Sequence, residues 1–391
     1  MKPLEIKNNI FWVGAIDWDL RNFHGYLTQR GSSYNAYLIV DEKITLVDTV
    51  KEPFFDEMLA RIKAVIDPGK IDFIVSNHTE MDHSGSIVKM LEIAKKATVI
   101  SSPNGEKGLL KHFNQKWNSM VIANGQSLNI GSRDLSFVLT PMVHWPDSMV
   151  TYIKKDSILF SNDAFGQHIA SLERFDDEIG LAIAKEEAAK YYANIVLPYA
   201  NQVTKALAEL SELNLEMICP SHGIIWRNNI KTIIDSYNSW AANKTENKAI
   251  IVYDTMWHST ERIAQTINQA FLELGINSRL MNLQFSHISD VMAEILDAQY
   301  VCVGSPTLNN QILPTVGAFL TYLKGLAPKN RIGLAFGSYG WGGQSISQIN
   351  EILQDSAFTT LDEIKVNYVP QPQELIEIKE KLINKLKEVK R

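Results

Sequence analysis

Residues 73–83 read FIVSNHTEMDH, and this stretch determines the fold more than any other part of the chain. It opens with an apolar run typical of a buried strand. Four side chains that bind metals then follow within six residues, namely His78, Glu80, Asp82 and His83. Carboxylates suit hard, redox-active iron and can bridge or charge-balance two metal ions. The stretch therefore predicts a two-iron site at the end of a strand.

The composition indicates a globular protein of about two domains. The chain has 391 residues, 45% of them hydrophobic, and a net charge of -6, which argues against a nucleic-acid partner. No apolar run reaches the roughly 20 residues that a membrane crossing needs, and Met1–Lys7 lacks the apolar region of a signal peptide. We expect a cytoplasmic protein without a membrane partner, and we expect Cys219 and Cys302 to be buried thiols.

The pattern of predicted elements divides the chain into domains 1–247 and 248–391. The first part mixes short strands with helices, and a polar stretch at 243–248 precedes a new apolar strand. From there strands and helices alternate, which predicts a parallel doubly wound sheet. These elements are a strand at 249–253, a helix at 261–274, a strand at 300–303, a helix at 316–323, a strand at 332–336 and a closing helix at 374–391.

Three more candidate ligands each follow an apolar run: His144, Asp163 and His222. A lone histidine is more often structural, but the order and spacing of all seven candidates resemble the metal-ligand pattern of the metallo-β-lactamase superfamily. That superfamily carries histidine where this chain has Glu80. With glutamate at this position, the ligand motif resembles more closely that of one branch, the flavodiiron proteins, also called A-type flavoproteins.

The resemblance implies an αββα sandwich for 1–247 with a role for each candidate. His78, Glu80 and His144 would hold one iron, Asp82, His83 and His222 the other, and Asp163 would bridge them. A zinc pair stays open. By the same resemblance, His24 and Tyr192 would overhang the substrate pocket as catalytic residues, His168 would orient a ligand, and Asp48 would support the metal loop; a turn cap is the alternative for Asp48. Each of these side chains is present at the stated position of the chain.

Three loops of the second part follow strands, where doubly wound sheets bind ligands: residues 254–260, 304–310 and 337–343. The first of these loops, residues 254–260, precedes a helix and carries no G-x-G-x-x-G fingerprint. It therefore predicts a loop that binds the phosphate of a mononucleotide. The loops resemble those of flavodoxins and imply an FMN site. Its residues would be Thr255, Met256, Trp257, His258, Ser259, Thr260, Pro306, Thr307, Leu308, Asn309, Asn310, Ser338, Tyr339, Gly340, Trp341, Gly342 and Gly343.

The resemblance to flavodiiron proteins implies an oxidoreductase. It would reduce O2 to water, NO to N2O, or both, at two non-haem irons, with electrons that FMN collects from a separate donor such as rubredoxin. A head-to-tail homodimer or a dimer of dimers is expected. Two alternatives remain at this point: a zinc hydrolase with an accessory flavodoxin domain, and an electron carrier on an inactive lactamase-like scaffold. The ligand residues leave the choice between O2 and NO open.

Overall fold

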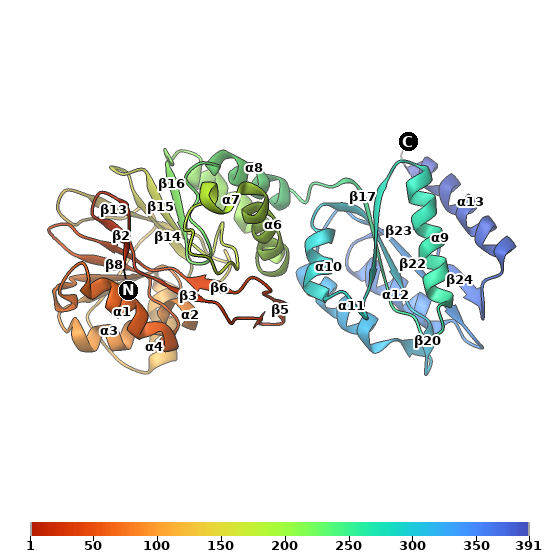
Figure 1. Ribbon diagram of the computed structural model, residues 1–391, viewed down its shortest axis with the longest axis horizontal. Helices are drawn as coiled ribbons and strands as arrows, with labels where there is room; N and C mark the ends of the chain where they lie inside the picture. Colours follow the sequence, from red (N-terminus) through yellow and green to blue (C-terminus); the bar gives the residue numbers. More distant parts are fainter. Residues whose placement is uncertain (1, 390–391) are drawn as a thin grey trace. The chain divides into compact units, whose positions relative to one another are not determined.

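A computed structural model describes residues 2–389, and the chain forms two compact units (Figure 1). Unit 1 comprises Met1–Tyr192 and Tyr199–Asn238, and unit 2 comprises Ala193–Pro198 and Ser239–Arg391. Among residues 2–389, no helix combines the length and the apolar character that a membrane crossing requires.

Unit 1 is built on two sheets. The larger has the order β1 (Leu4–Lys7), β2 (Ile10–Trp12), β7 (Tyr37–Ile39), β8 (Thr45–Val47), β9 (Phe73–Ser76), β10 (Thr98–Ser101) and β11 (Ser119–Val121). The smaller has the order β12 (Ser127–Asn129), β13 (Asp134–Leu139), β14 (Met149–Ile153), β15 (Ile158–Asn162) and β16 (Met217–Pro220). Two short pairs complete the strands: β3 (Ala15–Asp17) with β6 (Ser32–Tyr34), and β4 (Asn22–Phe23) with β5 (Tyr26–Leu27).

The helices of unit 1 lie on both sides of these sheets (Figure 1). The first group is α1 (Phe55–Lys63), α2 (Met81–Ser84), α3 (Ile87–Ile93) and α4 (Pro103–Phe113). The second is α5 (Asp176–Ile179), α6 (Leu181–Tyr191), α7 (Ala200–Leu210) and α8 (Ile230–Ala241), with a π-helical turn at Tyr192–Val196.

Alternation along the strands explains how unit 1 is layered, because successive side chains of a strand point to opposite faces. Val47 and Val75 belong to the core between the two sheets, whereas their neighbours Leu46 and Ile74 belong to the core beneath the first group of helices. Both faces of the central strands are therefore buried, as the apolar run before Asn77 indicates. The predicted αββα sandwich is confirmed.

Unit 2 has one parallel sheet of the order β18 (Asn277–Asn282), β17 (Glu246–Tyr253), β19 (Ala298–Gly304), β22 (Ile332–Tyr339) and β23 (Thr359–Thr360); β24 (Ile364–Asn367) also pairs with β22. Its helices are α9 (Ser259–Glu273), α10 (Ile288–Ile295), α11 (Pro314–Leu326), α12 (Gln344–Asp355) and α13 (Pro372–Val389). A small hairpin joins β20 (Thr307–Leu308) to β21 (Gln311–Ile312). The predicted doubly wound parallel sheet is confirmed.

Several predicted boundaries in unit 2 were wrong by a few residues. β17 starts at Glu246, because its N–H bonds to the carbonyl of Asp297, so the polar stretch is partly strand. β22 continues to Tyr339, because its last residues pair with β24. The closing helix is α13, and residues 390–391 of the prediction lie outside the described residues. The limit between residues 247 and 248 falls within β17 and stays a prediction.

Candidate metal centre and flavin pocket

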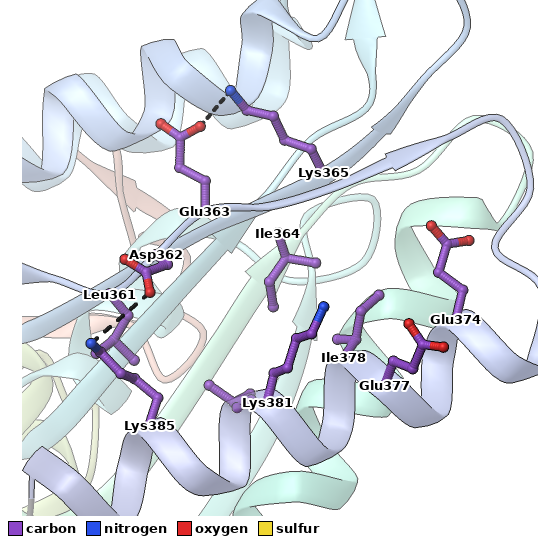
Figure 2. Close-up of a pocket in the computed structure, with 11 residues that line it drawn as sticks. Leu361, Asp362, Glu363, Ile364, Lys365, Glu374, Glu377, Ile378, Lys381 and Lys385 are labelled. Atoms are coloured by element: carbon purple, nitrogen blue, oxygen red, sulfur yellow. Dashed lines mark ion pairs between the residues drawn. The ribbon is translucent and has the colours of Figure 1, made fainter.

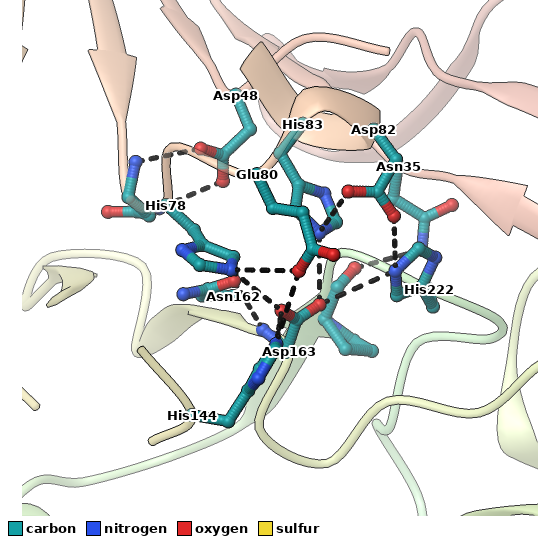
Figure 3. Close-up of polar contacts among 12 residues, drawn as sticks. Asn35, Asp48, His78, Glu80, Asp82, His83, His144, Asn162, Asp163 and His222 are labelled. Carbon is teal, nitrogen blue, oxygen red and sulfur yellow. Dashed lines mark hydrogen bonds and ion pairs between the residues drawn. The ribbon is translucent and has the colours of Figure 1, made fainter. Parts of the chain in front are cut away.

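All seven predicted metal ligands come together in unit 1 (Figure 3). Each follows the end of a strand or lies on the short helix α2, so the connections after the strands deliver them to one edge of the sandwich. They form two groups, and within each group the ligand atoms lie within 4.8 Å of one another. One group is His78, Glu80, His144 and Asp163, and the other is Asp82, His83 and His222.

Asp163 lies between the two groups, with one carboxylate oxygen towards each. Its Oδ2 lies 3.1 Å from Nε2 of His144 and 3.6 Å from Nε2 of His78. Its Oδ1 lies 3.1 Å from Nε2 of His83 and 3.5 Å from Nε2 of His222. This is the position that a carboxylate bridging two metal ions would occupy.

Buried polar atoms without hydrogen bonds show that the cluster fits metal ions. Among the described residues, both carboxylate oxygens of Asp82, both ring nitrogens of His83 and Oδ1 of Asp163 have no hydrogen-bond partner. These side chains are at most 4% exposed, and leaving such groups unsatisfied is costly. Nε2 of His83 and Oδ1 of Asp163 are 3.1 Å apart without hydrogen-bond geometry, as expected of atoms directed at a common cation.

Three carboxylates and three imidazoles of the cluster hold one another in their charged forms, namely Glu80, Asp82 and Asp163 with His78, His83 and His144. Burial alone would lower the pKa of His78, but hydrogen bonds to Asp147 and Glu80 raise it to about 10. Burial alone would raise the pKa of Glu80, but hydrogen bonds from His144 and His78 hold it below its usual range. These three carboxylates are thus ionised at neutral pH, and metal binding has to displace protons from His78, His83 and His144.

Residues outside the ligand set fix the orientation of the ligands. Nδ1 of His78 donates to Oδ2 of Asp147 at 2.9 Å, and the Thr79 N–H donates to the same oxygen at 2.7 Å. Nδ1 of His222 donates to the carbonyl of Ser33 at 2.7 Å. These bonds leave each Nε2 free to bind a metal. Neither Asp147 nor Ser33 was predicted from the sequence; the position of Asp147, three residues after His144, was the available signal.

The predicted support by Asp48 has a counterpart in the structure. Its carboxylate accepts hydrogen bonds from the backbone N–H of Asn77 at 2.8 Å and from Nδ2 of Asn77 at 3.1 Å. Asp48 is buried and has a φ of 56°, a conformation that aspartate tolerates better than most residues. It holds the first residue after β9, so that His78 enters the cluster in a fixed direction.

The bond between Asp147 and His78 leads to a testable prediction. We expect Asp147→Asn to weaken metal binding by about 10- to 100-fold, because the amide no longer fixes His78 as a charged acceptor does. Metal content after dialysis against a graded chelator measures the effect. Asp134→Asn, at an exposed position of β13, is the matched control. Equal metal retention in the two variants would contradict this role for Asp147.

The three residues predicted from the resemblance to act around the metals lie in different surroundings. His24 forms the tip of the β4–β5 hairpin; its side chain is 71% exposed, and its Nε2 lies 3.0 Å from Oε1 of Glu80. His168 is buried, its Nδ1 lies 2.8 Å from Oγ of Ser32, and its ring centroid is 4.9 Å from that of His222. Burial holds the pKa of His168 well below its usual range, so this ring is neutral.

Tyr192 is buried with its ring edge-on to Tyr237, at 5.0 Å between centroids. The preceding residue, Tyr191, lies nearer the ligands: its ring centroid is 5.1 Å from that of His168 and 6.0 Å from that of His222. Burial and then the charges of Asp163, Asp82 and Glu80 raise the pKa of Tyr191. The sequence prediction named Tyr192 and not Tyr191, the tyrosine that lies nearer the ligands.

Unit 2 has a pocket of about 690 Å³ where the three predicted loops meet. Fourteen of the seventeen predicted FMN residues line it, and the lining also includes Tyr368 and Val369, which follow β24. Three predicted residues do not line it. His258 points away, with Nδ1 2.7 Å from Oε2 of Glu261, Thr260 is buried beside Ser338 at 3.2 Å between hydroxyl oxygens, and Gly343 lies behind Tyr339.

The chemistry of this pocket suits a flavin mononucleotide. Ser259 lines it at the first residue of α9, a helix of 15 residues, where backbone N–H groups face an anion. Trp341 is 92% exposed at the rim, and Tyr339 lies beside it. Among the described residues, none that lines the pocket carries a formal charge, so hydroxyls and amides would hold the phosphate.

Comparison with known proteins supports the fold and the kind of site described for each of the two units. Residues 33–223 match the family described as ODP family beta lactamase, and residues 251–381 match the flavodoxin family. The chain is 46% identical over 381 residues to a nitric oxide reductase of Moorella thermoacetica, covering 96% of each chain.

Two solved structures are also similar over nearly the whole chain. The rubredoxin oxygen:oxidoreductase of Desulfovibrio gigas has a TM-score of 0.96 with 42% identity, and the match covers 99% of each chain. The flavodiiron protein of Giardia intestinalis has a TM-score of 0.96 with 33% identity, covering 98% of this chain and 96% of that one.

Fold and site thus define a two-part protein, with a metallo-β-lactamase-like unit that gathers seven metal-binding side chains and a flavodoxin-like unit with a nucleotide-sized pocket. The chain belongs to the flavodiiron protein family.

Proposed function

We propose that this protein is an oxidoreductase that reduces O2 to water, NO to N2O, or both, with electrons delivered through FMN. The observation that carries the proposal is the position of Asp163 between two groups of ligands, in a chain that also has a flavin-type pocket. The names of the relatives, a nitric oxide reductase and a rubredoxin oxygen:oxidoreductase, point to the same two gases.

The proposed metals are two non-haem irons. His78, Glu80 and His144 would hold one, Asp82, His83 and His222 the other, and Asp163 would bridge them. Two irons bound here would accept electrons from FMN and pass them to a small diatomic gas. The three carboxylates of the set would offset most of the positive charge of two ferrous ions, so little buried charge would stay uncompensated.

The role of the protein around the metals is to fix ligands and move protons. Asp147 and Ser33 orient the rings of His78 and His222, as their hydrogen bonds indicate. His24 can pass a proton from solvent to the cluster, because it is largely exposed and its Nε2 lies within hydrogen-bond distance of Oε1 of Glu80. We retain the proposals that Tyr192 overhangs the substrate pocket as a catalytic residue and that His168 orients a ligand, and we add Tyr191, whose ring lies near those of His168 and His222.

For FMN, we propose that the phosphate binds at the loop Thr255–Thr260 and that the flavin ring lies between the loops at 306–310 and 338–343. Tyr368 and Val369 complete the lining. Trp341 is the side chain best placed to cover the ring, because it stands almost fully exposed at the rim of the pocket. Small residues such as Gly340 and Gly342 allow the backbone to approach the ring closely.

The proposal also covers the electron donor, the oligomeric state and the cellular compartment of the protein. We propose a rubredoxin-like electron donor, a head-to-tail homodimer or dimer of dimers, and a place in the cytoplasm without nucleic-acid or membrane partners. The donor is suggested by the name of the Desulfovibrio gigas relative. A zinc hydrolase is not favoured, since hydrolysis has no use for the flavodoxin unit and the named relatives are reductases.

Glu80 provides a test of the metal identity. We expect Glu80→His to lower both iron content and gas reduction by at least about 10-fold while FMN stays bound, because a neutral imidazole replaces a hard anionic ligand. Glu92→His, at an exposed position of α3, is the matched control. Iron and flavin content are measured with turnover. Unchanged gas reduction in Glu80→His would contradict the proposed role of this residue.

A further inference from the structure

A second groove of unit 2, of about 320 Å³, shares no lining residue with the flavin pocket (Figure 2). One wall is β24 with the residues just before it, from Leu361 to Lys365. The opposite wall is α13, from Glu374 to Lys385. The groove therefore runs between an edge strand and the closing helix.

The unpaired backbone edge of β24 faces this groove. β24 pairs with β22, and within residues 2–389 no strand pairs with its other edge. Glu363 and Lys365 line the groove although their side chains turn towards α12, where Ser347 lies 3.4 Å from Oε2 of Glu363 and 2.8 Å from Nζ of Lys365. Their main chain therefore faces the groove, and such an edge is a template for another strand.

The floor of the groove is apolar. Leu361 and Leu382 are 6% and 5% exposed and belong to the core of unit 2. Ile364 and Ile378 pack against this core and are only partly buried. An extended segment places alternate side chains on one face, so two apolar residues separated by one position would cover these isoleucines.

The helix wall is charged oppositely at its two ends. Nζ of Lys385 lies 4.0 Å from Oδ2 of Asp362, so the end of α13 with Lys381 and Lys385 lies at the start of β24. Glu374 is eleven residues earlier, about 16 Å along the helix, and marks the other end together with Glu377 (Figure 2). Among the described residues, neither Lys381 nor Glu377 forms an ion pair, so both are available to a ligand.

We propose that this groove docks an extended segment of a partner protein, which adds to β24 as an antiparallel strand. Antiparallel ladders are slightly more stable per residue than parallel ones. In that direction the segment begins beside Glu374 and Glu377 and ends beside Lys381 and Lys385. On the strand wall, Asp362 already pairs with Lys385 and Glu363 with Lys365, so the helix wall sets the preference. It selects a basic residue first, two alternating apolar residues in the middle and an acidic residue last.

Two synthetic peptides test the proposal on the full chain: acetyl-KTVTVTE-amide and the charge-reversed acetyl-ETVTVTK-amide. We expect the lysine-first peptide to bind at least about 10-fold more tightly, measured by fluorescence anisotropy, and to slow hydrogen exchange of amides in residues 362–367. Lys381→Glu combined with Lys385→Glu should abolish this preference. Lys387→Glu, at an exposed position of α13 outside the groove, should retain it.

Three results would overturn the proposal. The first is binding weaker than about 1 mM for both peptides, and the second is equal affinity for the two charge orders. The third is self-association of the chain that protects residues 362–367 without peptide and is lost in the double lysine variant. That last outcome would assign the groove to a second copy of this chain. None of these measurements depends on iron, FMN or gas reduction.

Discussion

Asp163→Asn is expected to abolish reduction of O2 and NO, lowering turnover by more than about 100-fold. The carboxylate has one oxygen near His144 and the other near His83, at 3.1 Å each, so it is the one side chain of the cluster that faces both groups directly with separate atoms. An amide keeps the shape of the side chain but cannot supply two anionic oxygens. Loss of a residue that only orients a ligand lowers metal affinity or activity by about 10- to 100-fold, and loss of a bridging ligand should lower them further.

Iron per chain, FMN per chain and turnover are to be measured together for this variant. We expect less than two irons and unchanged FMN, because the flavin pocket lies in the other unit. Thermal unfolding of the metal-free variant is to be measured as well, because removing one partner of a buried ion pair destabilises the fold and Asp163 pairs with His83 and His144. Two tightly bound irons with full turnover in Asp163→Asn would show that the two groups of ligands do not share this bridge.

Ser259→Asp is expected to weaken FMN binding by about 30-fold or more. Two unit charges 4 Å apart repel by about 1 kcal/mol even in water, and the FMN phosphate carries nearly two charges. The substitution should not disturb folding, because an acidic residue in the first turn of a helix interacts favourably with the helix dipole. Ser259 begins α9 and lines the pocket, so the new carboxylate would meet the phosphate directly.

Ser259→Ala is the matched control and should cost FMN affinity much less, since it removes one hydroxyl without adding charge. Flavin fluorescence during titration of the FMN-free protein measures both. Iron content should stay the same in either variant, because all seven candidate metal ligands lie in unit 1. Equal FMN affinity in Ser259→Asp and the unaltered chain would place the phosphate elsewhere.

The sequence could predict those site residues that directly follow a recognisable strand. The apolar run before His78, and those before Asp163 and His222, identify strands whose following loops carry ligands, and the structure gathers these side chains. The loops after β17, β19 and β22 are predictable for the same reason, because parallel strands bring their carboxyl ends to one edge.

The parts that could not be predicted depend on tertiary packing. Ser33 supports His222 through a backbone carbonyl 189 positions away, and a carbonyl carries no sequence signal. Tyr191 and Tyr192 are adjacent tyrosines, and only the course of the helix decides which faces His168. The extension of β22 to Tyr339 results from pairing with β24, a strand of four residues, whereas the glycines at 337 and 340 indicated a loop.

The most direct test of the proposed reaction is anaerobic turnover of the iron-loaded, FMN-loaded and photoreduced protein with O2 and NO in parallel. The proposal predicts consumption of at least one gas, with water or N2O as the product and reoxidation of the flavin in step with it. Failure to consume either gas with both cofactors bound would contradict it.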